Sequence, residues 1–359
     1  MGDGPEGKDR SLHLIGNSSW LIGFFLILAV LIISFSARAM GADASLKAEE
    51  KRTWQGGVLY RFADAEEGCA LLLGCSKYYD AFSRYDLDYR AQKKNADFEK
   101  DLLPIIKASV VEFSREEKVL VSDTMEWLNG RLCELGAFLP LPDEIVFAAT
   151  TMEEERGMAA YTRGNGIFLG KDFLRTFVAE TADSERILEF RYVLAHELFH
   201  CLTRHDEDFR SALYGILGVK LAGEDFVFRG ERPERMISNP DVEHNNAYAA
   251  FTVDGEKKNC ALFLYTNRPF EREGDLFLDE AKLGIVPIDT LNRLYEIEEL
   301  PDFWEVLGKN TSYVIAFEEC LADNFACALV YGLDGKAYST PGIPEEILAY
   351  LQGTERREI

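Results

Sequence analysis

The sequence predicts an α+β fold in which a small mixed sheet accompanies two buried helices. The first helix is expected at residues 192–202, a stretch without glycine or proline that is apolar on nearly every side. The second is expected at 317–330, an apolar run that carries three acidic residues. Short segments between 144 and 169 are rich in β-branched and aromatic residues and are separated by turn signals, which is typical of strands.

The first element along the chain, residues 1–44, is expected to be an export signal or a membrane anchor. Residues 20–35 are apolar and uncharged throughout, slightly short for a membrane span and slightly long for a signal-peptide core. Ala37-Arg38-Ala39 and Ala42-Asp43-Ala44 both satisfy the small-x-small cleavage pattern. A cleaved signal and an uncleaved anchor that contacts the membrane both stay open. Both predict a membrane-anchored or exported protein with its main body in the periplasm or extracellular space.

Residues 45–359 are expected to form the main domain. It begins with a mixed, aromatic-rich segment, followed by a helical pattern over 96–135 that is interrupted near Pro104 and around Ser114. Strands are expected at 144–150 and at 159–169, the second with Gly164-Asn165-Gly166 as a turn or bulge between its halves.

A long insertion is expected at 207–310, between the two buried helices. Its expected elements are short strands at 226–228, 248–253 and 260–265, and helical character from 288 onward. One short helix from Pro344 is expected to close the domain.

Composition limits the function classes. The chain has 359 residues, of which 47% are hydrophobic, which is enough for a substantial core. Its formal net charge of −23 argues against nucleic acid as a partner, because phosphates would be repelled. The seven cysteines are an odd number and cannot all pair within the chain, although Cys69 and Cys75 are close enough in sequence for a local disulfide.

The first buried helix carries His196-Glu197-Leu198-Phe199-His200, a complete HExxH. Residues four apart lie on one face of a helix, so both imidazoles can reach a single metal ion. Glu197 is turned about 100° away and borders the metal without binding it, where a general base must stand. Three of the five histidines lie between 196 and 205, and a buried cluster of this kind without a metal would leave costly unpaired polar groups.

The second buried helix carries Glu319 and Asp323, which are four apart and therefore on one face. Two carboxylates on a buried face repel each other and are costly to desolvate unless cations compensate. A zinc ion bound by Glu319, with Asp323 accepting the ring N–H of a ligating histidine, resolves both problems. Two histidines, one glutamate and a water form an established type of catalytic zinc site, with one Zn²⁺ per chain.

At these residues the chain resembles the gluzincin metallopeptidases, in which HExxH on one helix is completed by Glu-x-x-x-Asp on a second. The resemblance implies that His196, His200 and Glu319 are zinc ligands, that Glu197 is the general base and that Asp323 orients a ligand. It also implies a zincin-like fold, with an edge strand above the metal. Such a strand could pair with an extended peptide, and an ordinary sheet edge is the alternative that stays open. The amino-acid sequence around the second helix is also similar to that of uncharacterised bacterial HExxH proteins.

Three further residues are candidates for the site. Asp206 falls ten residues after His196, where metzincins place their third ligand, although Thr203 stands where that group has a glycine. Tyr313 and His244 are candidates for stabilising an oxyanion.

The sequence therefore predicts a zinc metallopeptidase that acts on a peptide or protein substrate. The alternative is a non-peptidase envelope protein that binds a partner and keeps zinc for structure. Retention of Glu197 argues against the alternative, because a structural site needs no base and is usually closed by four protein ligands.

Overall fold

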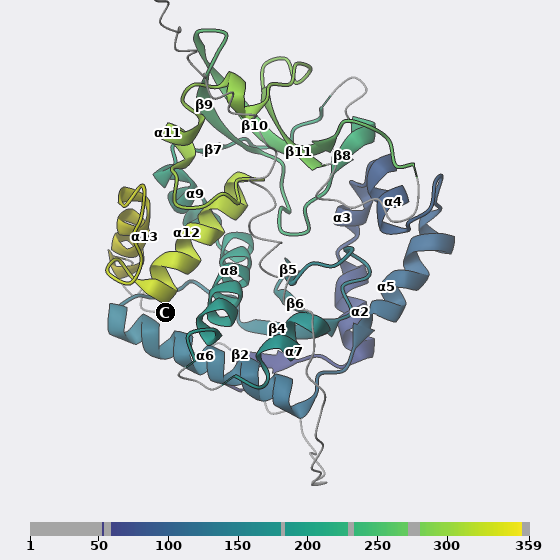
Figure 1. Ribbon diagram of the computed structural model, residues 1–359, viewed down its shortest axis with the longest axis vertical. Coiled ribbons are helices and arrows are strands. Elements are labelled where there is room, and N and C mark those ends of the chain that lie inside the picture. Colours follow the sequence, from purple (N-terminus) through teal and green to yellow (C-terminus); the bar gives the residue numbers. More distant parts are fainter. Residues whose placement is uncertain (1–51, 54–58, 181–183, 229–232, 272–280, 354–359) are drawn as a thin grey trace, which may run out of the picture.

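The computed structural model describes residues 52–53, 59–180, 184–228, 233–271 and 281–353. The described chain is a mixed α/β protein with two small sheets, and a pair of helices lies between them (Figure 1). The expected α+β, zincin-like fold class stays a prediction.

The first sheet is mixed and ends in a strand that matters for the site. Its strand order is β1-β2-β4-β6-β5, with β3 paired to β4. The strands are β1 (Arg52–Thr53), β2 (Leu59–Phe62), β3 (Val110–Val111), β4 (Glu144–Thr150), β5 (Ala160–Arg163) and β6 (Gly166–Gly170). Strand β4 has the expected bounds. The expected strand at 159–169 is a tight antiparallel hairpin of β5 and β6, with Gly164 at φ +56° in its turn.

The part of the chain that forms the first sheet also forms helices, several of which pack on that sheet. The helices are α2 (Ala65–Gly74), α3 (Ser76–Asp80), α4 (Arg84–Arg90), the π-helical turn η3 (Phe98–Leu102), α5 (Leu103–Ser109), α6 (Arg115–Leu135) and α7 (Lys171–Phe177). The expected break at Ser114 is confirmed, because Ser114 caps α6 in a capping box with Glu117. Pro104 lies in the first turn of α5, where a missing N–H does little harm.

The two expected buried helices are α8 (Ile187–His205) and α12 (Phe317–Tyr331). They lie side by side in the centre of Figure 1, and the Phe199 and Phe325 rings meet between them at 5.3 Å. Nearly all of α12 is buried, so its polar residues must find partners inside the protein.

The second sheet belongs to the expected insertion and is antiparallel. Its order is β11-β10-β9-β7, with β8 paired to β10. The elements of this half are α9 (Glu207–Ile216), β7 (Lys220–Leu221), η4 (Pro233–Arg235), β8 (Met236–Ile237), β9 (Ala247–Val253), β10 (Glu256–Thr266), β11 (Ala281–Pro287), η5 (Ile297–Glu299), α11 (Phe303–Leu307) and the closing helix α13 (Gly342–Gly353).

Two expectations for this half are wrong. The segment 226–228 is not a strand, because it is anchored by its side chains, with the Phe228 ring 4.5 Å from that of Phe263. Helical character from 288 onward is also wrong, since that stretch holds turns and one short 3₁₀ segment before α11 begins. The expected strands at 248–253 and 260–265 and the closing helix are confirmed.

The expected location needs correction. Among the described residues, no helix is both long and apolar enough to cross a membrane. The two longest, α6 and α8, carry charged residues along their length. The expectation of a membrane-anchored or exported protein, with its body in the periplasm or extracellular space, is therefore contradicted. The segment 1–44, with its apolar run, lies outside the described residues.

Candidate metal centre

Helix α8 brings the HExxH residues into the interior. His196 and His200 lie one turn apart on the face that meets α12, and their rings are 4.9 Å apart in an edge-on arrangement. All three polar residues of the motif are buried. The side chains are thus held in the core, where an unpaired donor or acceptor is costly.

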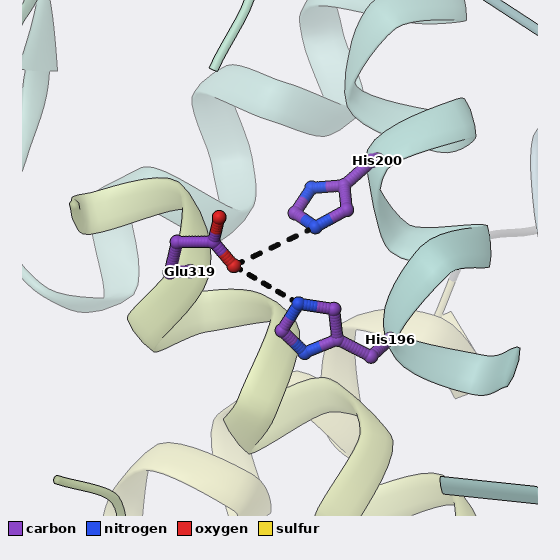
Figure 2. Close-up of side chains that lie close together, drawn as sticks. All are labelled: His196, His200 and Glu319. Atoms are coloured by element: carbon purple, nitrogen blue, oxygen red, sulfur yellow. Dashed lines mark hydrogen bonds and ion pairs between the residues drawn. The ribbon is translucent and has the colours of Figure 1, made fainter. Parts of the chain in front are cut away.

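Glu319 on α12 reaches both histidines (Figure 2). Its Oε2 atom lies 2.9 Å from His196 Nε2 and 3.7 Å from His200 Nε2. Ligand atoms at about 2.0–2.1 Å from a tetrahedral zinc are separated by roughly 3.3 Å, so the two distances bracket the spacing that zinc requires. The structure therefore brings together the three ligands that the sequence predicted.

The other nitrogen of His196 faces Asp323. His196 Nδ1 lies 3.0 Å from Asp323 Oδ1, and the same carboxylate accepts hydrogen bonds from Tyr192 and Thr311. Burial alone would lower the pKa of His196, but its hydrogen bonds to Asp323 and Glu319 raise that pKa well above its usual value. These carboxylates thus favour positive charge at this point, carried either by a ring proton or by a metal ion.

His200 has a carboxylate partner that the sequence analysis missed. Its Nδ1 lies 2.9 Å from Glu318 Oε1, and the Glu318 carboxylate also accepts from Thr203 and Tyr214. Burial alone would raise the pKa of Glu318, but these hydrogen bonds lower it below its usual value, so the group is an ionised acceptor. His200 Nδ1 must then carry the proton.

The remaining nitrogen of His200 is an unsatisfied acceptor. Burial lowers the pKa of His200, so the ring is neutral and Nε2 holds a lone pair. This atom is buried and has no hydrogen-bond partner within the described part of the chain. A metal ion next to Glu319 would satisfy it, and the donor set of two imidazoles and one carboxylate fits zinc.

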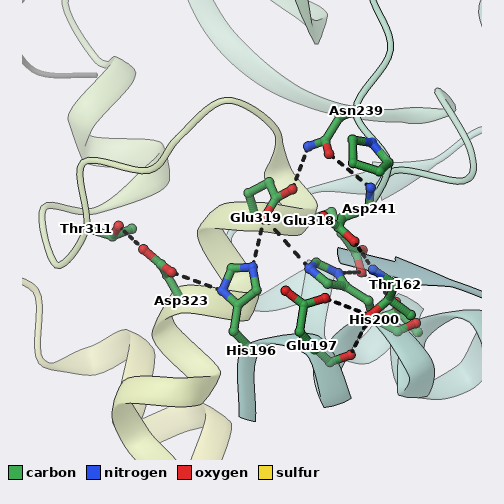
Figure 3. A network of polar contacts seen from close by, with 12 residues as sticks. Thr162, His196, Glu197, His200, Asn239, Asp241, Thr311, Glu318, Glu319 and Asp323 are labelled. Carbon is green, nitrogen blue, oxygen red and sulfur yellow. Dashed lines mark hydrogen bonds and ion pairs between the residues drawn. The ribbon is translucent and has the colours of Figure 1, made fainter. Parts of the chain in front are cut away.

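The charge of the surroundings also fits a divalent cation. The buried carboxylates around the centre are those of Glu197, Asp241, Glu318, Glu319 and Asp323 (Figure 3). Buried carboxylates at such close range destabilise one another unless cations compensate.

Glu197 lies beside the ligand set, as its position on the helix predicts. Its Oε2 accepts a hydrogen bond of 2.7 Å from Thr162 Oγ1 on β5. Burial raises the pKa of Glu197 well above its usual value, and the carboxylate of Asp241 raises it further, against the effect of His196. A carboxylate with a raised pKa is a better proton acceptor near neutral pH.

Three residues from the first sheet and the second half of the chain complete the site, and none was predicted. Thr162 comes from β5, and Asn239 and Asp241 come from the loop after β8. Asn239 donates to Glu319 Oε1, the oxygen that His196 does not contact. Residues on loops have no periodicity that would have linked them to the helices.

The other candidates do not join the ligand set. Asp206 ends α8 and caps α9 by accepting from Phe209 N at 2.8 Å. His244 is exposed and lies 3.4 Å from Asp225. Tyr313 is buried next to the centre, with its ring 6.1 Å from that of His196, so it remains a candidate for oxyanion stabilisation. Both Cys69 and Cys75 are free thiols.

Comparisons of the chain with protein-family models, with curated proteins and with solved structures found no match. The gluzincin resemblance therefore rests on the site residues themselves.

Glu318→Gln should lower zinc affinity about tenfold, the lower end of the loss when an outer-shell partner of a ligand is removed. The amide is a weaker, uncharged acceptor for His200 Nδ1–H and no longer fixes the ring as firmly. Zinc affinity measured by chelator competition checks this, with the exposed Glu345→Gln as the matched control. Equal zinc affinities in Glu318→Gln and Glu345→Gln would show that Glu318 does not orient the His200 ring.

Proposed function

We propose that this chain is a zinc-dependent peptidase that hydrolyses peptide bonds, with Glu197 as the general base. One observation carries the proposal: two imidazoles and one carboxylate converge on a point where His200 Nε2 has no partner, while a further carboxylate, that of Glu197, stands alongside. A purely structural site would have no use for that additional group.

Zinc, when bound, supplies a Lewis acid that polarises a carbonyl and lowers the pKa of water to about 7. The other functions fall to residues of the chain. Glu197 accepts the proton of the attacking water and passes it to the leaving amine. Thr162 holds the Glu197 carboxylate in place, and Asp323 and Glu318 fix the two imidazole rings. The edge strand β5 offers backbone groups to an extended peptide.

A second candidate is a protein that binds a partner without cleaving it and keeps zinc for stability. The position of Asp241 favours this candidate, because its carboxylate lies with the ligand atoms of Glu197 and His200, within 4.8 Å of one another. A fourth protein ligand would close the coordination sphere, as structural zinc sites do.

Metal removal tests the proposal. We expect the purified protein to hold about one zinc per chain. We also expect it to cleave members of a broad peptide library, detected by mass spectrometry. Chelation should abolish cleavage and one equivalent of zinc should restore it, with circular dichroism confirming that the chain stays folded. A zinc-loaded protein that cleaves no library member, either as wild type or as Asp241→Asn, would favour the second candidate.

A further inference from the structure

The 238–243 loop, residues between β8 and β9, lies against the metal centre and is firmly held there. At its start, Ser238 N donates to Asp86 Oδ1 at 2.9 Å and Ser238 O accepts from Arg90 at 2.8 Å. In its middle, Pro240 O accepts from Arg163 and from Arg204. The loop therefore has a defined closed position.

Asp241 points from this loop into the centre (Figure 3). Its side chain is buried, and one of its oxygens lies within 4.8 Å of a ligand atom on His200 and of one on Glu197. Glu318 contacts His200 Nδ1, and the other ring nitrogen, Nε2, has no hydrogen-bond partner among the described residues. His200 therefore belongs to two groups of possible metal ligands, one with His196 and Glu319 and one with Glu197 and Asp241.

The same carboxylate blocks the edge of β5. Thr162 N donates to Asp241 Oδ1 at 2.6 Å, so this N–H points away from β6 and toward the outer edge of the sheet. An extended peptide that adds to the edge needs such outward N–H and C=O groups. The Thr162 carbonyl is also engaged, since it accepts from Arg163 at 3.3 Å. A peptide cannot pair with Thr162 while the loop is closed.

Asn239 couples the loop to the ligand set. It donates to Glu319 through its side-chain NH₂, and its Oδ1 accepts from Asp241 N at 2.9 Å. Movement of Asp241 would therefore disturb a contact of the third metal ligand as well.

A cavity that the loop itself helps to line offers space for such movement. A cavity of about 380 Å³ is lined by Asn239, Pro240 and Val242 of the loop and by Phe263 and Ile315 opposite. Withdrawal of the loop would enter this cavity and would not need to displace the core.

We propose that Asp241 is a fourth, exchangeable metal ligand, carried on a loop that must withdraw before a peptide pairs with β5. This inference rests on the proposed function and concerns the regulation of the same site. While the 238–243 loop is closed, the peptidase is inactive. Opening would withdraw the Asp241 carboxylate from the proposed metal position and would free the Thr162 N–H in the same movement.

Asp241→Asn tests the assignment with little risk to folding, because the amide oxygen can still accept from Thr162 N. The matched control is Glu243→Gln, a loop carboxylate whose side chain is 43% exposed and whose only described ion pair, with Arg204, spans 3.4 Å. Zinc affinity is measured by chelator competition, the donor set by the visible spectrum of the Co²⁺-loaded protein, and opening of the loop by hydrogen exchange of residues 238–243.

We expect Asp241→Asn to lower zinc affinity about tenfold or more, to change the Co²⁺ spectrum and to speed exchange in the loop. Peptide hydrolysis at saturating zinc should rise about tenfold, because a larger fraction of chains is open. Glu243→Gln should leave zinc affinity and the Co²⁺ spectrum unchanged.

The possible failures are distinguishable. Unchanged zinc affinity and an unchanged Co²⁺ spectrum in Asp241→Asn overturn the assignment of Asp241 as a ligand, whatever the peptidase activity. Lower affinity and a changed spectrum with no hydrolysis in either protein support the ligand and overturn the peptidase function. Lower affinity with hydrolysis that falls overturns latency, because Asp241 would then support the reaction.

Discussion

Glu197→Gln should abolish most peptide hydrolysis while zinc remains bound. Glutamine keeps the size of the side chain and an oxygen that can accept from Thr162 Oγ1, so the local packing survives. It cannot accept the proton of the attacking water, and the rate should fall about 10²–10⁴-fold, the usual contribution of a general base. Because Glu197 is outside the ligand set, zinc content should stay near one per chain.

Hydrolysis rate, zinc content and melting temperature should be measured on one preparation. The matched control is Glu189→Gln, the same substitution at an exposed position near the start of α8. Glu189→Gln should behave as wild type in all three measurements. Turnover in Glu197→Gln equal to that of the control would exclude Glu197 as the base.

Removal of a metal ligand should have the other large effect. His200→Ala and Glu319→Ala should each lose zinc at concentrations that saturate the wild type, because each variant lacks one of the three residues proposed to hold the ion permanently, and Asp241 is proposed to be exchangeable. Zinc at about 100 times its Kd stabilises a folded protein by about 2.7 kcal/mol. The wild type should therefore melt several degrees higher with zinc than without it, and the two variants should show no such rise.

Asp206→Ala is the control for the third ligand. Asp206 caps α9, so its loss should cost about 1 kcal/mol of stability with zinc affinity unchanged. If Asp206→Ala lost zinc and Glu319→Ala kept it, the third ligand would be Asp206, as in metzincins, and not Glu319, as in gluzincins.

The part of the site that lies on helices could be predicted from sequence, because helical geometry is regular. His196, His200, Glu319 and Asp323 each follow from a spacing of four residues within an apolar run. Glu318 has no such spacing to Glu319, and its role appears only when the position of His200 opposite α12 is known.

The loop residues could not be predicted for a different reason. Asn239 and Asp241 lie far in sequence from both helices, and only the packing of the second sheet brings them to the centre. The strand expected at 226–228 was wrong for a similar reason: Phe226 N donates one hydrogen bond to Asn245 O and the Phe228 ring packs on Phe263, but no strand ladder forms. The helix expected after 288 was wrong because part of that stretch bonds to the second sheet instead: Tyr295 and Ile285 exchange two backbone hydrogen bonds of 2.9 Å.

The position of the centre between α8 and α12 also gives zinc a role as a removable cross-link. His200 and Glu319 are more than a hundred residues apart, and a bound ion ties them into one closed loop that contains the whole second sheet. Closing a loop costs entropy that grows slowly with length, about 0.6 kcal/mol for each doubling. Residues 207–310 can therefore lengthen or shorten at little cost to the centre, whereas loss of zinc removes the cross-link and leaves only the packing of α8 on α12 to hold the ends of the segment together.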